Sequence, residues 1–127
     1  MRSIRTMDRT NSSFYRLMGP IFGSRQVARE VGIHCYDDDE KEWVMSFDAD
    51  KLIGWLSVRG RLVSDCYVIP SARHDGVFDS LLEYTVRHMG GGLWANCTAA
   101  SVRGFEKAGF VKVSATKNFT KMEQNHA

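Results

Sequence analysis

The chain lacks any hydrophobic run near the ~20 apolar residues that a membrane-spanning helix needs, so we expect no membrane span. Cysteine is scarce: Cys35, Cys66 and Cys97 are odd in number, have no CxxC spacing and lie in strand-like runs. Such thiols usually act as small buried hydrophobes, and they predict no metal or redox site. The first residues also lack the apolar segment of a secretory signal, which favours a cytoplasmic protein.

A dominant charge of one sign is absent as well. The 17 basic and 15 acidic residues leave a net charge of +2, and the arginines form no stripe, so nucleic-acid binding is not expected. The one charge run, residues 37–40, is acidic and lacks the ligand spacing of a calcium loop, so it is interpreted as a solvated loop. Only 2 Pro accompany 3 Trp, 4 Tyr and 7 Phe. This balance predicts one folded domain over residues 1–127.

The first half of the chain predicts a short strand, two helices and a β-meander. Helix signals cover residues 11–18, which Asn11 or Ser12 can cap and which Gly19 and Pro20 should end, and then residues 24–31. The expected strands are residues 3–7, 43–47, 51–58 and 62–69, with 33–36 as a candidate partner of 43–47. Short turns between the last three strands indicate antiparallel pairing.

After Pro70 the hydrophobic period becomes helical. Apolar residues from Phe78 to Met89 form one stripe, which predicts a helix that the glycines at 90–92 end. A strand (93–98), a helix (99–108) and a strand pair (110–114 and 118–122) should follow. The strand–helix–strand unit over 62–98 makes its two strands parallel. The predicted fold class is therefore α/β, a mixed and mainly antiparallel central sheet with a parallel βαβ crossover and helices on both faces.

The turn inside this crossover carries the first functional signal. A strand ends at Pro70 and a helix opens near Gly76, where backbone N–H groups lack helical partners and the helix dipole adds positive charge. A phosphate or pyrophosphate fits such a turn. Gly76 lets a ligand approach the backbone, and Arg73 adds charge at the rim. The alternative is that Gly76 only shapes the turn.

The order of elements, the Arg73-x-x-Gly76 turn and the segment Gly104-Phe-Glu-Lys-Ala-Gly-Phe110 together resemble the GNAT superfamily of acyl-CoA-dependent N-acetyltransferases. The phosphate loop of that family reads Arg/Gln-x-x-Gly-x-Gly/Ala, and its last helix commonly carries Tyr-Glu-Lys-x-Gly-Phe. The resemblance covers residues 3–122 in topology and 62–110 in motifs. It implies transfer of an acetyl group from acetyl-CoA to an amine whose identity is not readable, without a metal. Whether the chain forms a homodimer stays open.

The resemblance also assigns the cofactor residues. The pantetheine arm would lie between the splayed parallel strands and pair with the backbone of the first, where an N–H near Val68 would polarise the thioester carbonyl. The pyrophosphate would sit on the amides of the turn, and the last helix would approach the sulfur. The residues assigned in this way are Tyr67, Val68, Ile69, Arg73, His74, Asp75, Gly76, Val77, Phe78 and Phe105.

Five positions depart from the family pattern. Phe78 stands where Gly or Ala is usual, and it either crowds the phosphates or turns into the core. Asp75 brings negative charge to the phosphate turn. Phe105 replaces a Tyr that would protonate the leaving thiolate, and Thr98 and Ser101 replace Asn and Ala. These departures motivate the alternative function, a catalytically degenerate GNAT-fold binding or structural protein of phage-related type.

Catalytic groups must then come from other residues. Asp65, in the first splayed strand, is either a general base or a surface or salt-bridged carboxylate. Tyr67 either donates a proton or packs, and Ser101 either replaces the missing acid or serves the backbone at the start of its helix. The histidines show no spacing for a nucleophilic triad, although His74 could help to bind an anion.

Overall fold

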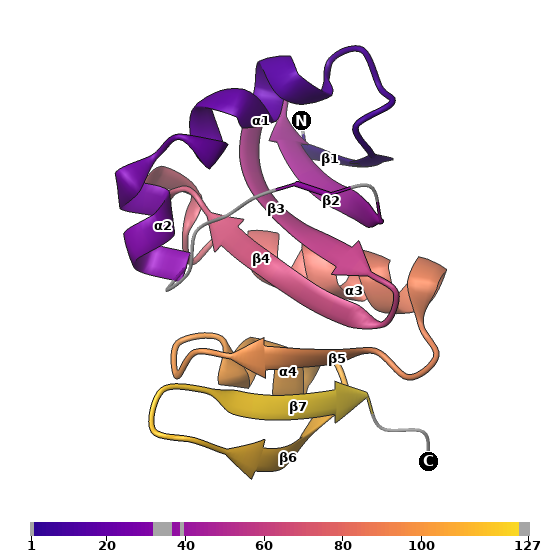
Figure 1. The fold of residues 1–127 in the computed structure, drawn as a ribbon, viewed down its shortest axis with the longest axis vertical. Helices are drawn as coiled ribbons and strands as arrows, with labels where there is room; N and C mark the ends of the chain where they lie inside the picture. Colours follow the sequence, from indigo (N-terminus) through magenta and orange to yellow (C-terminus); the bar gives the residue numbers. More distant parts are fainter. Residues whose placement is uncertain (1, 32–36, 39, 125–127) are drawn as a thin grey trace.

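The computed structural model describes residues 2–31, 37–38 and 40–124, and over these ranges it shows a seven-stranded sheet with helices on both faces (Figure 1). The elements in chain order are β1 (Arg2–Met7), α1 (Phe14–Phe22), α2 (Arg25–Val31), β2 (Lys41–Asp48), β3 (Lys51–Arg59), β4 (Leu62–Val68), the 3₁₀ helix η1 (Pro70–Ala72), α3 (Val77–Met89), β5 (Trp94–Cys97), α4 (Val102–Lys107), β6 (Phe110–Ala115) and β7 (Thr120–Gln124). The predicted strand at 33–36 lies outside the described residues.

The sheet has the order β1-β2-β3-β4-β5-β7-β6, and its strands are antiparallel except for the pair β4 and β5. These two parallel strands are in register at a single position, Leu62 with Trp94. Beyond this point they separate, which leaves a gap in the middle of the sheet (Figure 1). The predicted meander, the parallel crossover and the mixed α/β class are confirmed.

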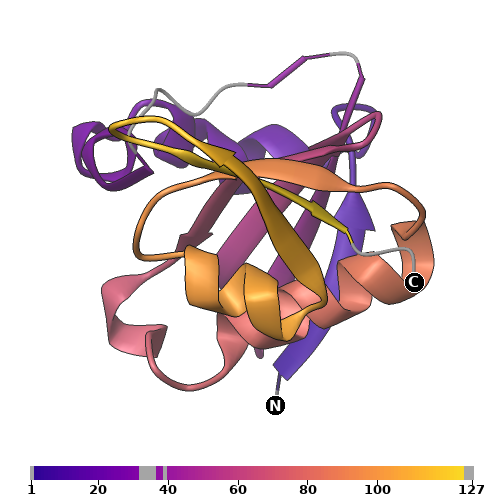
Figure 2. The ribbon, with the colours of Figure 1, turned by 90° about the horizontal axis from the view of Figure 1, so that it is seen from below.

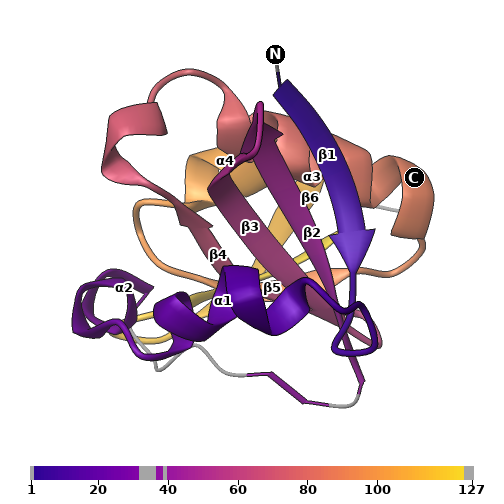
Figure 3. The same ribbon diagram turned by 90° about the horizontal axis from the view of Figure 1, so that it is seen from above.

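Each face of the sheet has its own core. Helices α1 and α2 cover one face and α3 and α4 the other, as Figures 2 and 3 show from opposite sides. Both sides of β2 and β3 are buried, because each strand contributes alternate residues to the two cores. The core under α1 and α2 consists of Phe14, Met18, Val27, Trp43, Met45, Phe47, Trp55 and Tyr67. The core under α3 and α4 includes Leu56, Leu81, Leu82, Phe105, Phe110 and Met122.

The predicted end of the first helix at Gly19 and Pro20 is wrong, because α1 continues to Phe22 with Pro20 inside it. Proline removes one helical hydrogen bond, but the extra turn brings the Phe22 ring to 5.6 Å from the Trp43 ring. Pro20 itself is exposed. Tertiary packing of the apolar face therefore outweighs the local preference of the sequence.

Candidate active site

A β-bulge shapes the strand that borders the gap. Trp55 pairs with Tyr67 and Ser57 with Ser64, so β4 holds one more residue than β3 over this interval. Asp65 lies in the bulge with φ of 58°, a left-handed conformation that few non-glycine residues adopt. Bulges bend a strand and redirect its side chains, and they are frequent beside active sites. The bulge lies where β4 leaves its parallel neighbour.

The Asp65 side chain is buried, and three side chains donate to its Oδ2, of which Ser64 is the most distant at 3.5 Å. Lys41 Nζ lies 2.9 Å from its Oδ2 and the hydroxyl of Ser57 donates to the same oxygen at 2.6 Å. Asp65 and Lys41 are 4% and 5% exposed, so this is a buried ion pair. The geometry matches the salt-bridged alternative for Asp65. To act as a general base, Asp65 would first have to lose its ion pair with Lys41.

Two cavities meet at the gap between β4 and β5. The first, about 670 Å³, runs along the end of β4, the turn and α4, and we call it the cofactor groove. Its described lining includes seven of the residues expected to bind the cofactor: Tyr67, Val68, Arg73, His74, Gly76, Val77 and Phe78. Ile69 and Asp75 are their chain neighbours. The topology has therefore brought most of the predicted cofactor residues to one groove.

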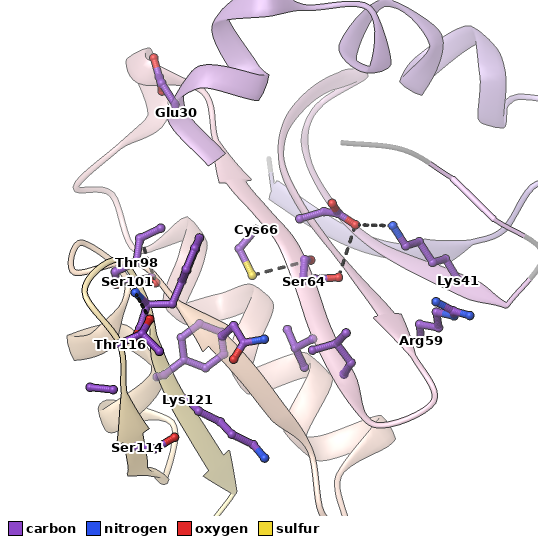
Figure 4. A pocket seen from close by; sticks show the side chains of 17 residues that line it. Glu30, Lys41, Arg59, Ser64, Cys66, Thr98, Ser101, Ser114, Thr116 and Lys121 are labelled. Carbon is purple, nitrogen blue, oxygen red and sulfur yellow. Dashed lines mark hydrogen bonds and ion pairs between the residues drawn. The ribbon is translucent and has the colours of Figure 1, made fainter. Parts of the chain in front are cut away.

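The second cavity, about 550 Å³, is lined by residues from both sides of the gap, and we call it the acceptor cleft (Figure 4). Lys41 and Arg59 border it on one side, and Ser114, Thr116 and Lys121 of the β6–β7 hairpin border it on the other. Phe105 and Asp65 also line this cleft. Four residues line both cavities: Glu30, Cys66, Thr98 and Ser101. A ligand in the groove and a ligand in the cleft would thus meet near Cys66, Thr98 and Ser101.

The turn before α3 contains two residues in the left-handed region. His74 and Gly76 have φ of 69° and 81°, and turns with left-handed residues can form concave sites where backbone N–H groups bind an anion. The N-cap residue of α3 is Gly76, which has no side chain to cap the helix. Asp75, whose charge was expected to oppose a phosphate, has a cationic partner, because Arg2 on β1 donates to its carbonyl at 2.7 Å and lies 3.6 Å from its carboxylate.

Arg73, expected at the rim of the phosphate site, is engaged by the protein itself. Its Nε donates to the Val68 carbonyl at 2.9 Å, its guanidinium forms an ion pair with Glu30 on α2, and it lies 5.3 Å from the centre of the Tyr67 ring. The hydrogen bond from Arg73 lowers the pKa of Glu30. Cofactor binding to the Val68 backbone would therefore compete with Arg73.

Tyr67 has features of both roles considered for it. Burial, with the nearby Glu30 carboxylate as a second cause, raises the pKa of its hydroxyl above the ordinary value, so the group stays protonated at neutral pH. Its ring also stacks on Trp55 at 5.0 Å. Tyr67 is thus a packed residue that retains a proton to give.

Ser101 stands at the start of α4, where the two cavities meet. Its hydroxyl donates to the Thr98 carbonyl at 3.1 Å and lies 3.3 Å from the Thr98 hydroxyl. The residue therefore does serve the backbone at a helix start, and its oxygen also lines both cavities. Burial raises the pKa of the neighbouring Cys97 to about 11, so this thiol remains protonated at neutral pH.

Phe78 turns toward α4 and packs there. Its ring meets Phe105 edge-on at 5.6 Å, and Phe105 in turn meets Phe110 at 5.0 Å. Of the two alternatives for Phe78, crowding of the phosphates or packing, the geometry matches packing. Phe105 is 2% exposed, so the residue in place of the expected Tyr forms part of the core.

Two residues at this site, Glu30 and Cys66, were not predicted from the sequence. Glu30 lies in the helix predicted over residues 24–31, but its place beside Arg73 depends on how α2 packs near β4. Cys66 was interpreted only as a small hydrophobe, whereas it is partly exposed and lines both cavities. Only the bulge brings it there, and a bulge at a non-glycine residue leaves no local signature.

Comparisons with known proteins concern the fold of the chain. No protein-family model and no curated protein matches the sequence. Among solved structures, Escherichia coli ElaA aligns with a TM-score of 0.74 and 12% identity over 98% of this chain and 100% of that one. Tetrahymena GCN5 aligns at 0.73 and 16% over 96% and 94%. The aminoglycoside acetyltransferase AAC(6')-Ib, in complex with coenzyme A and kanamycin, aligns at 0.69 and 12% over 99% and 95%.

These identities are low, and the likeness shows the fold. The protein has the fold of the GNAT N-acetyltransferases. No helix in the described part of the chain is long and apolar enough to cross a membrane. Within the same residues, no three His, Cys, Asp or Glu side chains gather where they could hold a metal ion.

Proposed function

We propose that the protein is an N-acetyltransferase that moves an acetyl group from acetyl-CoA to an amine. The observation that carries this proposal is the meeting of two cavities at Cys66, Thr98 and Ser101, where β4 and β5 separate. A two-substrate transfer needs such a junction, because the thioester and the amine must approach from different sides. The occurrence of coenzyme A in a structural neighbour of the same fold supports the choice of cofactor.

The cofactor would lie in the groove. Its pyrophosphate would bind the N–H groups of the turn between His74 and Phe78, and its pantetheine arm would pass along Val68 toward Cys66. Arg73 would then exchange Glu30 and the Val68 carbonyl for the phosphates, which a guanidinium binds strongly.

The chemical step would take place at the junction. The amine nitrogen attacks the thioester carbon, the N–C bond forms, and the C–S bond breaks. A backbone N–H near Val68 would stabilise the oxyanion, and such stabilisation is usually the largest source of acceleration in acyl transfer. The amine loses its proton to water, and Ser101 or Tyr67 protonates the thiolate. In this scheme Asp65 holds the bulge through Lys41 and leaves proton transfer to other groups.

A specific observation favours the second function, a binding protein that has lost catalysis. Phe105 lines the acceptor cleft without a hydroxyl, and its ring is fixed between Phe78 and Phe110. The two functions make the same prediction for coenzyme A binding and differ only in turnover.

Calorimetric titration with acetyl-CoA and with CoA tests the proposal directly. Gly76→Trp should abolish binding, because the added side chain would occupy the phosphate site. Gly60→Trp is the matched control: both glycines have positive φ and open space where a Cβ would be, but Gly60 lies in the β3–β4 hairpin. We expect both variants to remain folded and only Gly76→Trp to lose binding. If wild-type protein binds neither ligand at millimolar concentration, the enzyme assignment is lost.

A further inference from the structure

Three neighbouring strands place a row of polar side chains on the floor of the acceptor cleft. Lys121 on β7 is the register partner of Asn96 on β5 and of Ser114 on β6. Cross-strand partners lie on the same face of a sheet, and all three residues line the cleft. Figure 4 shows Lys121 and Ser114 on the hairpin side of this cavity. An amide, an ammonium and a hydroxyl therefore face one ligand, and we call them the cleft row.

The cleft row lies close enough to the junction of the two cavities, at Cys66, Thr98 and Ser101, for one small ligand to contact both. Thr98 follows Asn96 by two residues, with its side chain on the same side of the chain, and it lines both cavities. Two residues of extended chain span roughly 7 Å. A small molecule in the cleft can thus touch the cleft row with one end and reach the junction with the other.

The charged side chains that line the acceptor cleft favour some classes of acceptor over others. Among the described residues that line it, the acidic ones are Glu30 and Asp65, and each has a cationic partner, Arg73 and Lys41. No described carboxylate of the lining is thus left to receive a polycation. Arg59, at the rim, pairs with Asp38 and Glu40.

Lys121 is held more weakly than these groups. Its ammonium lies 3.7 Å from the Glu123 carboxylate, on a pair of partly exposed side chains, and 5.0 Å from the centre of the Trp94 ring. Exposed pairs of this kind contribute little and exchange readily. The ammonium can therefore turn to an anionic ligand in the cleft, where the neighbouring amide and hydroxyl add hydrogen bonds.

We propose that the acceptor is an amine that carries a carboxylate, an amino acid or a short peptide, whose carboxylate binds Lys121, Asn96 and Ser114 while its amine faces Thr98 and Ser101. This assignment rests on the proposed acetyl transfer. The amine is acetylated as described above, with one N–C bond formed, one C–S bond broken and one proton released. The carboxylate takes no part in the chemistry and serves only for recognition.

Matched acceptors test the assignment. Acetylation of glycylglycine, glycylglycinamide and spermidine is compared at equal acetyl-CoA. We expect kcat/KM for glycylglycine to exceed that for its amide by about 10- to 100-fold, since a charge-assisted contact is lost in the amide. Lys121→Met should reduce the ratio to near one. Lys112→Met, which removes an exposed lysine of the same hairpin outside the described lining, should keep the ratio. Glu123→Gln should raise this kcat/KM ratio, because it removes the carboxylate that pairs with Lys121.

A binding measurement separates this inference from the proposed function. N-acetylglycine and N-acetylglycinamide are titrated into the free protein and the CoA-loaded protein, and the backbone NMR signals of Asn96, Ser114 and Lys121 are followed. Shifts with N-acetylglycine only, lost in Lys121→Met, support the cleft row even if CoA fails to bind. Equal shifts with both compounds, or none with either, overturn it. Efficient acetylation of spermidine or of the amide would refute the acceptor class while leaving the acetyltransferase intact.

Discussion

Phe78 and Gly104 fit each other across the interface of α3 and α4. A Cβ on Gly104 would lie 2.5 Å from the nearest atom of the Phe78 ring, closer than side chains in proteins approach. The ring occupies the space that the missing side chain leaves, with Phe105 on its other side. The bulky residue in the phosphate motif is thus accommodated by a glycine 26 positions later in the sequence.

The effect of Gly104→Ala on the free energy of unfolding should change sign when Phe78 is replaced by alanine. Gly104→Ala in the wild-type protein should lower the free energy of unfolding by about 1–3 kcal/mol, since it overpacks the interface. In a Phe78→Ala background, the same change should raise it by up to about 1 kcal/mol, because alanine favours a helix over glycine. Urea unfolding of the four proteins measures both effects. Additive effects would mean that the two residues do not touch.

The buried pair of Lys41 and Asp65 should be essential for stability. Lys41→Met leaves the Asp65 carboxylate buried without its cation, and removal of one partner of such a pair costs about 3–5 kcal/mol. Chemical denaturation should show this loss. We expect Lys41→Met with Asp65→Asn to recover most of it, because asparagine is neutral and tolerates the left-handed backbone of the bulge. A loss below about 1 kcal/mol for Lys41→Met alone would show that the carboxylate reaches water.

Glu30 should restrain cofactor binding through Arg73. Glu30→Gln removes the ion pair and leaves Arg73 available to phosphates, so the Kd for CoA should fall by about two- to fivefold at neutral pH. Glu83→Gln, which breaks the exposed pair with Arg87, is the control and should leave the Kd unchanged. Calorimetry gives both values.

The pH dependence of this effect has a definite sign. The pKa of Glu30 is lowered by Arg73, so Glu30 stays ionised at neutral pH and the restraint is fully present there. As the pH falls through the lowered pKa, Glu30 takes up a proton and the wild type should approach Glu30→Gln. A difference between the two proteins that grows on acidification would contradict the role given to Glu30.

The sequence predicted the order and the topology of the elements because these follow from local periods and connection rules. The stripe from Phe78 to Met89 and the two strands around it allow one parallel crossover, and the cofactor turn at Gly76 follows from that crossover. The bulge at Asp65 was not predictable, because its left-handed backbone is held by Lys41, 24 residues away. The continuation of α1 through Pro20 likewise depends on contact with Trp43. Local patterns predicted the turn at Gly76, which lines one cavity, whereas the second cavity depends on long-range packing.

Phe105 offers the sharpest test of catalysis. Its ring lines the acceptor cleft one helical turn after Ser101, in the position where the GNAT resemblance expects a Tyr that protonates the leaving thiolate. Phe105→Tyr should raise the rate of acetyl transfer or thioester hydrolysis about tenfold, which is modest for a positioned acid because Ser101 or Tyr67 already supplies a proton. Release of CoA, followed with a thiol reagent, measures this rate. The buried hydroxyl should cost about 1–3 kcal/mol of stability wherever it lacks a partner.

Phe110→Tyr is the control, since it adds the same hydroxyl to the same aromatic cluster but does not belong to the described lining of the cleft. It should lose stability without a gain in rate. Ser101→Ala should slow the wild type more than it slows Phe105→Tyr, because the new hydroxyl takes over the proton transfer. Inactivity of both the wild type and Phe105→Tyr with bound acetyl-CoA and a wide panel of amines would decide for the binding protein.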